Sequence, residues 1–300
     1  MPKNKKKPRK QDDSLKSRKR AKKGRSKTTR GEVYYNNDLL ISSWKARDEL
    51  YETLFGQPVS ISPPDYAPPK LLKSKDDAAA REAEFQLENT SGQLDVSNQQ
   101  LAVFTYAPDP IRPYWTYITA GLSTPWLQDE AQEVSGFGLE LVIKSPIEAD
   151  WPAQILRTMA YYIFNHMGTL SPTVRLALNS SVVAGGDSLL RNMLIWYADE
   201  APDSWYQLPS GGFGIFTAIG ITDDEMKLTE SLHEEYGTWC MQQILRQIGL
   251  GQITDPSRSS VMDRDDISSV INSVQGFAEQ FHQDFPNANR LNSCGIEEQN

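Results

Sequence analysis

Residues Phe213–Ile221, with the sequence FGIFTAIGI, form the most completely apolar segment of this 300-residue chain. Read as a strand, the segment has two apolar faces, because successive side chains point to opposite sides of a sheet. Such a strand belongs in a sheet that helices cover on both sides. The segment therefore predicts an α/β arrangement with a buried strand at its centre.

A second strand and a helix are predicted within Ser135–Met167. Apolar residues alternate with other residues over Gly138–Lys144, which is the period of a strand. From Ile155 the apolar residues recur at three and four, as on one face of a helix. Pro152 suits the first turn of that helix, where its missing N–H costs nothing. The order is therefore strand, turn, helix.

The remaining elements follow from the same rules. Thr222 and Glu225 form the capping box T-x-x-E, which marks the start of a helix. Residues Leu189–Tyr197 are compatible with a strand or a helix. We also expect strands over Leu101–Tyr106 and Tyr114–Leu122, an edge strand within Ile253–Asp263, and helices from Asn37 or Asp38 to Gly56, from Thr238 to Gly249 or Gly251, and over Ile267–Phe281. The fold class is therefore an α/β or α+β sandwich, with a mixed central sheet covered by helices.

The charge is distributed unevenly along the chain. Residues 1–30 carry 15 of the 31 Lys and Arg and 2 of the 39 Asp and Glu, a balance of +13, which leaves 16 basic and 37 acidic residues, or −21, for the rest. Residues 1–36 are expected to be a disordered polybasic tail, because they bury too little apolar area to offset the entropy of ordering. A folded domain follows over 37–263, in which 70–98 reads as an exposed helix or a mobile insertion. Residues 264–300 are expected to form a C-terminal helix and a polar tail.

The basic tail is a candidate binding segment. Its positive charge suits nucleic acid or an anionic surface. The same charge is equally consistent with a solubilising extension that has no specific partner. The candidate electrostatic residues are Lys5, Lys6, Lys7, Arg18, Lys19, Arg20, Lys22 and Lys23.

Several classes of protein are disfavoured by what the sequence does not contain. No uninterrupted apolar run of 18 residues exists, and the N-terminus is basic, so we expect no membrane span or signal peptide and a cytoplasmic location. Cys240 and Cys294 are the only cysteines and lack zinc or redox spacing, which favours two reduced thiols.

No catalytic motif is recognisable either. The glycine pairs Gly136/Gly138 and Gly212/Gly214 lack the third glycine of G-x-G-x-x-G and lead into strands, so they indicate bends and close backbone approach rather than a phosphate site. H-E-x-x-H and G-x-S-x-G are both absent. The acidic group at 263–266 reads as surface rather than as a cation site. We expect neither an enzyme nor a bound cofactor or metal.

Aromatic residues supply a different signal. Trp115, Trp126, Trp196 and Trp205 are expected near loops or strand ends. Amphipathic aromatic rings are frequent anchors of protein interfaces, although they also fill cores. The two interpretations hold for different rings.

Taken together, several motifs resemble the Suppressor of fused family. The resemblance covers residues 40–263 and begins with Ser43-Trp44 and Gln57-Pro58; its motifs stand in the expected order, and S-G-F-G-L-E-L is the most specific of them. They are W-x-Y-I-x-x-G-L-S at Trp115–Ser123, S-G-F-G-L-E-L at Ser135–Leu141, W-P-x-x-I-L at Trp151–Leu156, G-F-G-I-F-x-x-I-G-I-T-D-D-E at Gly212–Glu225 and I-T-D-P-S-R-S-S-V at Ile253–Val261. Within them, Gly136, Phe137, Gly138, Glu140, Trp151 and Pro152 are expected to be structural.

The resemblance implies a non-enzymatic protein-binding domain. The animal namesake of the family sequesters a transcription factor by gripping an extended peptide as an added strand. Bacterial members are associated with polymorphic toxin systems as immunity-type proteins, and this chain resembles a single-domain bacterial member. By the same resemblance, Tyr117 and Asp129 would lie by the peptide groove, with Trp115 and Trp126 as further partner-binding candidates.

We therefore expect an immunity-type or scaffold protein that binds and neutralises or sequesters a protein partner. The charge of −21 outside the tail suits a basic partner, such as a nuclease toxin. The alternative is a nucleic-acid-associated regulator that acts through the basic tail.

Overall fold

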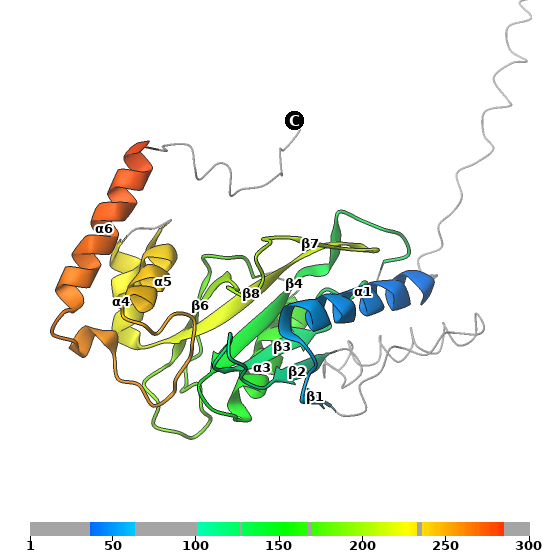
Figure 1. The fold of residues 1–300 in the computed structure, drawn as a ribbon, viewed down its shortest axis with the longest axis horizontal. Coiled ribbons are helices and arrows are strands. Elements are labelled where there is room, and N and C mark those ends of the chain that lie inside the picture. Colours follow the sequence, from blue (N-terminus) through cyan, green and yellow to red (C-terminus); the bar gives the residue numbers. More distant parts are fainter. Residues whose placement is uncertain (1–36, 64–100, 127, 167–169, 233–235, 285–300) are drawn as a thin grey trace, which may run out of the picture. The chain divides into compact units, whose positions relative to one another are not determined.

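The computed structural model describes residues 37–63, 101–126, 128–166, 170–232 and 236–284. In this part of the chain, eight strands form one mixed sheet in the order β1-β2-β3-β4-β8-β6-β5, with β7 paired to β8 (Figure 1). The elements are α1 (Asn37–Phe55), β1 (Ser60–Ser62), β2 (Ala102–Tyr106), β3 (Trp115–Ala120), β4 (Val134–Ser145), α3 (Trp151–His166), β5 (Arg175–Ala177), β6 (Asn192–Tyr197), β7 (Tyr206–Leu208), β8 (Gly211–Ile221), α4 (Asp223–Leu232), α5 (Gly237–Gln247), the 3-10 helix η2 (Val261–Asp263) and α6 (Ile267–Asp284).

Strand β8 is the centre of the sheet. All of its residues are buried. It pairs in parallel with β4 on one side and antiparallel with β6 on the other. The predicted strand with two apolar faces is therefore confirmed, and its neighbours supply the hydrogen bonds that a buried backbone requires.

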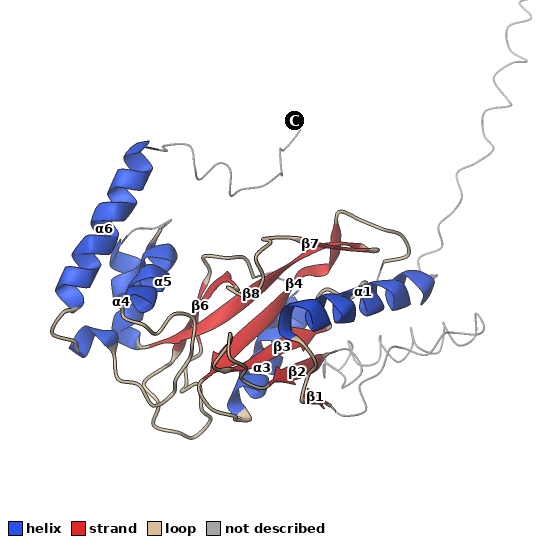
Figure 2. Cartoon of the chain, in the orientation of Figure 1, coloured by secondary structure: helices blue, strands red, loops and turns tan. Residues whose placement is uncertain are grey.

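Helices cover both faces of the sheet, as Figure 2 shows. Phe216 and Ala218 of β8 belong to the core beneath α3. Ile215, on the other face, packs in the core beneath α1. Ile219 and Ile221, farther along that same face, pack against α4, α5 and α6. One face thus has a single covering helix, and the other has two helical groups. The expected sandwich with a mixed sheet is confirmed.

Local sequence signals correctly predicted the extent of α1 and the start of α4. Helix α1 begins at Asn37 and ends before Gly56, which has a φ of +80° and donates its N–H to the Glu52 carbonyl at 2.9 Å. The capping box of α4 is formed, because the Thr222 N–H donates to Glu225 Oε2 at 3.0 Å and the Glu225 N–H donates to Thr222 Oγ1 at 3.4 Å.

The conformation of two segments became clear only from the tertiary structure. The ambiguous segment 189–197 contains strand β6, because β8 offers it a ladder of partners. The edge strand predicted within Ile253–Asp263 is wrong for the most part, since this stretch has one isolated bridge, Lys144 to Ile253, and ends in η2. The Thr254 N–H still donates to the Lys144 carbonyl at 2.9 Å, but Pro256, two residues farther on, lacks the N–H that a continuing ladder would need.

The expected polybasic tail over 1–36, the whole segment 70–98 and the polar end of the chain after 284 lie outside the described residues. Among the helices that are described, none is long and apolar enough to cross a membrane.

Candidate partner-binding site

Glu140 joins two of the motifs found in the sequence. Its side chain is fully buried. The carboxylate accepts hydrogen bonds from Thr119 Oγ1 at 2.6 Å, from the N–H groups of Gly121 and Ser123 at 2.9 Å each, and from Ser123 Oγ at 2.7 Å. A buried carboxylate must find such donors, because desolvation of an unpartnered charge is costly. Glu140 therefore fixes the backbone of the turn that follows β3.

The S-G-F-G part of the motif closes on the same turn. The Phe137 N–H donates to the Leu122 carbonyl at 2.8 Å, and Ser135 Oγ donates to the Ser123 carbonyl at 2.5 Å. Gly136 has a φ of +58°, and a Cβ added to it would lie 2.5 Å from the carbonyl oxygen of Leu122. Only glycine fits this position. The expectation of close backbone approach is therefore met at Gly136.

Gln128 fixes the loop that connects β3 to β4. Its Nε2 donates to the carbonyls of Val134 and Ser210, at 3.1 and 3.2 Å, and its Oε1 accepts the Gly136 N–H at 2.7 Å. Between these anchors, residues 129–134 are exposed. The structure thus presents a short acidic loop on a rigid base.

An exposed tryptophan lies beside this loop. Trp205 is 46% exposed and Val134 is 38% exposed. Both flank Gly138, since a Cβ added there would lie 2.6 Å from Val134 Cγ1 and 3.6 Å from Trp205 Cη2. We call the half-buried Trp126, together with the exposed Asp129, Glu130, Glu133, Val134 and Trp205, the loop rim. It combines exposed apolar side chains with acidic ones.

The four predicted partner-binding residues fall into two pairs. Tyr117 is buried, and its hydroxyl accepts the Ala149 N–H at 2.9 Å. Burial raises the pKa of Tyr117. Trp115, on the same strand, is half-buried against the core beneath α3. Trp126 and Asp129 lie on the connecting loop instead, where Trp126 is half-buried and Asp129 is exposed. The structure therefore does not bring the four together on one exposed surface.

The other motif residues are internal. Phe137 packs edge-to-face on Phe164 of α3, with ring centroids 5.1 Å apart. Trp151 is buried at the start of α3, with Pro152 next to it in the first turn. These residues attach α3 to the sheet.

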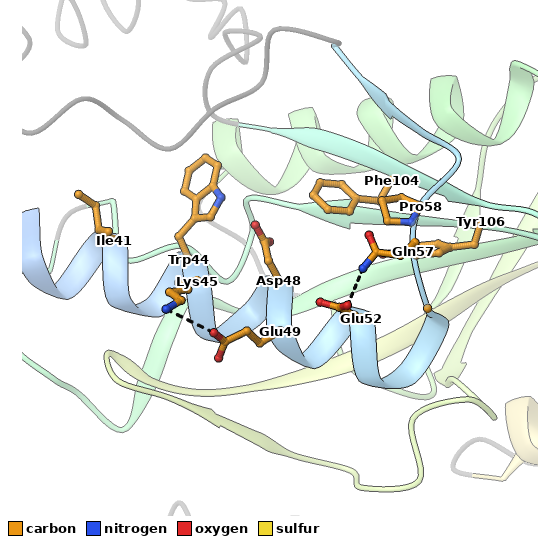
Figure 3. A pocket seen from close by; sticks show the side chains of 11 residues that line it. Ile41, Trp44, Lys45, Asp48, Glu49, Glu52, Gln57, Pro58, Phe104 and Tyr106 are labelled. Atoms are coloured by element: carbon orange, nitrogen blue, oxygen red, sulfur yellow. Dashed lines mark hydrogen bonds and ion pairs between the residues drawn. The ribbon is translucent and has the colours of Figure 1, made fainter.

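A groove runs along α1, between the helix and strand β2 (Figure 3). Its volume is about 430 Å³. Aromatic side chains of Trp44, Phe104 and Tyr106 form its inner wall, and acidic side chains of α1 stand along its edge. The chain after α1 closes one end with Gln57 and Pro58.

The three acidic side chains that line the groove, Asp48, Glu49 and Glu52, have different hydrogen-bond and ion-pair partners. Arg47, itself buried, binds Asp48 through Nε at 3.1 Å and Nη2 at 2.8 Å. Glu49 lies 3.6 Å from Lys45, and both side chains are largely exposed. Glu52 accepts a hydrogen bond from the Gln57 amide at 2.5 Å. Two exposed carboxylates therefore lack a close, buried cationic partner among the described residues.

The groove adjoins the loop rim. Trp44 contacts Trp126 edge-to-face, with ring centroids 6.1 Å apart. Arg47 Nη1 donates to Thr124 Oγ1 at 3.2 Å. Sequence reasoning identified Trp126 and Trp205 as candidates and missed the groove. The available signal was the acidic spacing of Asp48, Glu49 and Glu52, which places the three side chains on neighbouring positions of one helix.

Within the described ranges, no group of three or more His, Cys, Asp or Glu residues could hold a metal ion.

Comparisons with known proteins add an independent finding. A family model described as Suppressor of fused protein matches residues 97–259. Drosophila Suppressor of Fused is similar at 21% identity and a TM-score of 0.49, over 60% of this chain and 46% of that chain. A Sufu–Fu complex is similar at 18% identity and a TM-score of 0.51, over 79% of this chain and 95% of that chain.

A putative Suppressor of fused homologue from Neisseria gonorrhoeae is similar at 18% identity and a TM-score of 0.40, over 57% of this chain and 80% of that chain. This chain thus spans less than half of the Drosophila protein's chain. A comparison with curated proteins found no match. The matched region 97–259 contains the loop rim, whereas α1 precedes it.

Proposed function

This chain belongs to the Suppressor of fused family, and on that premise we propose that it is a non-enzymatic domain that binds and sequesters or neutralises a protein partner. A Sufu–Fu complex has a similar fold, which supports a protein as the ligand. An immunity-type or scaffold role is the use we propose for this binding. A basic protein such as a nuclease toxin fits the charge of −21 outside the tail.

The loop rim is the surface we propose for the partner. The observation that carries this choice is Trp205, a large aromatic side chain that is 46% exposed beside Val134 on a loop with fixed ends. Exposed aromatic residues on preorganised loops are typical hot spots, because they bury much area and lose little conformational freedom on binding. Asp129 and Trp126 belong to this surface. Tyr117 and Trp115 would contribute to partner binding indirectly, by packing strand β3 against the core.

The test is capture of partners by the full chain from a lysate of its source organism. We expect Trp205→Ala to reduce the captured partner by about tenfold or more, as for a hot-spot residue. Asp129→Asn should have a smaller effect. Tyr162→Ala is the matched control, since Tyr162 is 53% exposed on α3 and does not belong to the loop rim. Equal capture by wild type, Trp205→Ala and Asp129→Asn would contradict the loop rim.

A second candidate function is nucleic-acid association through the tail. The balance of +13 over residues 1–30 favours it. Binding of RNA or DNA by the full chain should then weaken with salt and disappear when the tail's Lys and Arg are replaced by Gln. Unchanged binding after that replacement would refute this candidate.

A further inference from the structure

We infer that the groove along α1 is a docking site for a basic, extended segment of the protein partner. The inference rests on the proposed function, because it takes a protein as the occupant, and it adds the chemistry of that occupant. The groove lies largely on α1, outside the region that the family model matches.

The shape of the groove suits a peptide. Its volume of about 430 Å³ is within the range of pockets that hold small ligands, roughly 300–1,000 Å³. Figure 3 shows Trp44 and Phe104 on the inner side, with the helix and the 57–58 segment around them. Aromatic walls favour aliphatic or aromatic side chains, and the open length along α1 favours an extended backbone over a compact ligand.

The charge of the groove selects the kind of peptide. Arg47 neutralises Asp48 with two hydrogen bonds, so that this carboxylate is already engaged. The Lys45–Glu49 pair is 3.6 Å long with side chains 76% and 64% exposed, and pairs of this kind contribute little. Glu52 has the Gln57 amide as its partner. Glu49 and Glu52 can thus exchange their present contacts for Lys or Arg at small cost.

The same charge argues against other occupants. Phosphates of nucleic acid and anionic lipid surfaces would be repelled by Glu49 and Glu52. An acidic protein segment would be repelled as well. A basic protein segment gains both charge complementarity and apolar contact. Because Trp44 touches Trp126, such a segment can continue from the groove onto the loop rim.

The experiment uses a fluorescein-labelled nonapeptide with four arginines around a central leucine. Fluorescence anisotropy measures its binding to the full chain in low and high salt. A second peptide carries citrulline in place of each arginine, which preserves the shape and removes the charge. We expect the arginine peptide to bind, the citrulline peptide to bind at least fivefold more weakly, and salt to weaken the arginine peptide.

Two double variants locate the binding. Glu49→Gln with Glu52→Gln should weaken the arginine peptide about fivefold to tenfold, as expected for two exposed charge pairs. Both side chains are exposed, so the variant should fold normally, which circular dichroism checks. Glu230→Gln with Glu279→Gln, at exposed positions of α4 and α6 outside the groove and the loop rim, is the matched control and should leave binding within about twofold.

Three results would overturn the inference. One is equal binding of the arginine and citrulline peptides. Another is loss of binding in the variant Glu230→Gln with Glu279→Gln and not in the groove variant. The third is a tenfold tightening when Lys5, Lys6, Lys7, Arg18, Lys19, Arg20, Lys22 and Lys23 are replaced by Gln, which would assign the site to this chain's own basic residues. None of these results affects the proposed function, which stands or falls with partner capture and Trp205.

Discussion

Strand β4 buries two opposite charges four positions apart. Glu140 and Lys144 lie on the same face of the strand, 0% and 1% exposed. Glu140 is held entirely by neutral donors within 21 residues of it in the sequence. Lys144 Nζ binds Glu200 Oε2 at 2.6 Å and Gln252 Oε1 at 2.7 Å, and it lies 5.5 Å from the centre of the Tyr114 ring.

The contrast shows two ways of burying a charge. Backbone N–H groups and hydroxyls surround Glu140, so its environment is created by the turn that it stabilises. Lys144 depends on a carboxylate and an amide from distant parts of the chain, and these meet only when the sheet is complete. We therefore expect Glu140 to shape a local surface and Lys144 to report on the integrity of the whole domain.

The largest effect is expected for Glu200→Ala. This change leaves Lys144 buried without its carboxylate, which should cost about 3–5 kcal/mol in the free energy of unfolding. Urea denaturation measures it. The double variant Glu200→Ala with Lys144→Met should recover part of the loss, because no unpaired charge remains. A loss below about 1 kcal/mol for Glu200→Ala would remove the distinction between the two sites.

A smaller effect is expected for Glu140→Gln. The amide keeps one acceptor oxygen for the N–H groups of Gly121 and Ser123, while the bond to Thr119 must reverse. The expected cost is about 1–3 kcal/mol in the free energy of unfolding. Partner capture should fall with it, because the loop rim loses its fixed base. Glu148→Gln, at an exposed position, is the control. A loss equal to that of Glu200→Ala would contradict the comparison.

The smallest effect concerns pH. Burial lowers the pKa of Lys144, and the nearby Glu200 only partly opposes this. Between that lowered pKa and the unfolded value of about 10.4, the unfolded chain binds more protons, so the free energy of unfolding rises with pH. Burial raises the pKa of Tyr114, which acts in the opposite direction above about pH 10.

The measurement is therefore the difference in unfolding free energy between wild type and Lys144→Met from pH 7 to 10. The wild type should gain relative to the variant as the pH rises. Glu140→Gln is measured in the same series. Its difference in unfolding free energy from wild type should not change with the alkaline titration of a lysine, which distinguishes the effect of Glu140 from that of Lys144. A constant difference for Lys144→Met would show that Lys144 stays protonated throughout this range.

Much of the fold was predictable from local signals. The all-apolar sequence of β8, the change of period before α3 and the capping box of α4 each depend on residues close in the chain. The motif S-G-F-G-L-E-L identified the family correctly, and its Gly136 is needed where two backbone segments approach closely. By contrast, segment 189–197 was ambiguous, because only pairing with β8 decides between strand and helix.

The same distinction between sequence and tertiary structure applies to the two proposed binding surfaces, the loop rim and the groove. The sequence by itself determined which residue types are available, including Trp126, Asp129, Trp205 and the acidic face of α1. Only the tertiary structure decided that Tyr117 is buried, that Trp205 is exposed beside Val134, and that α1 and β2 enclose a groove. The physical reason is that exposure and enclosure arise from contacts between segments far apart in the chain, whereas period, capping and turn chemistry are local properties.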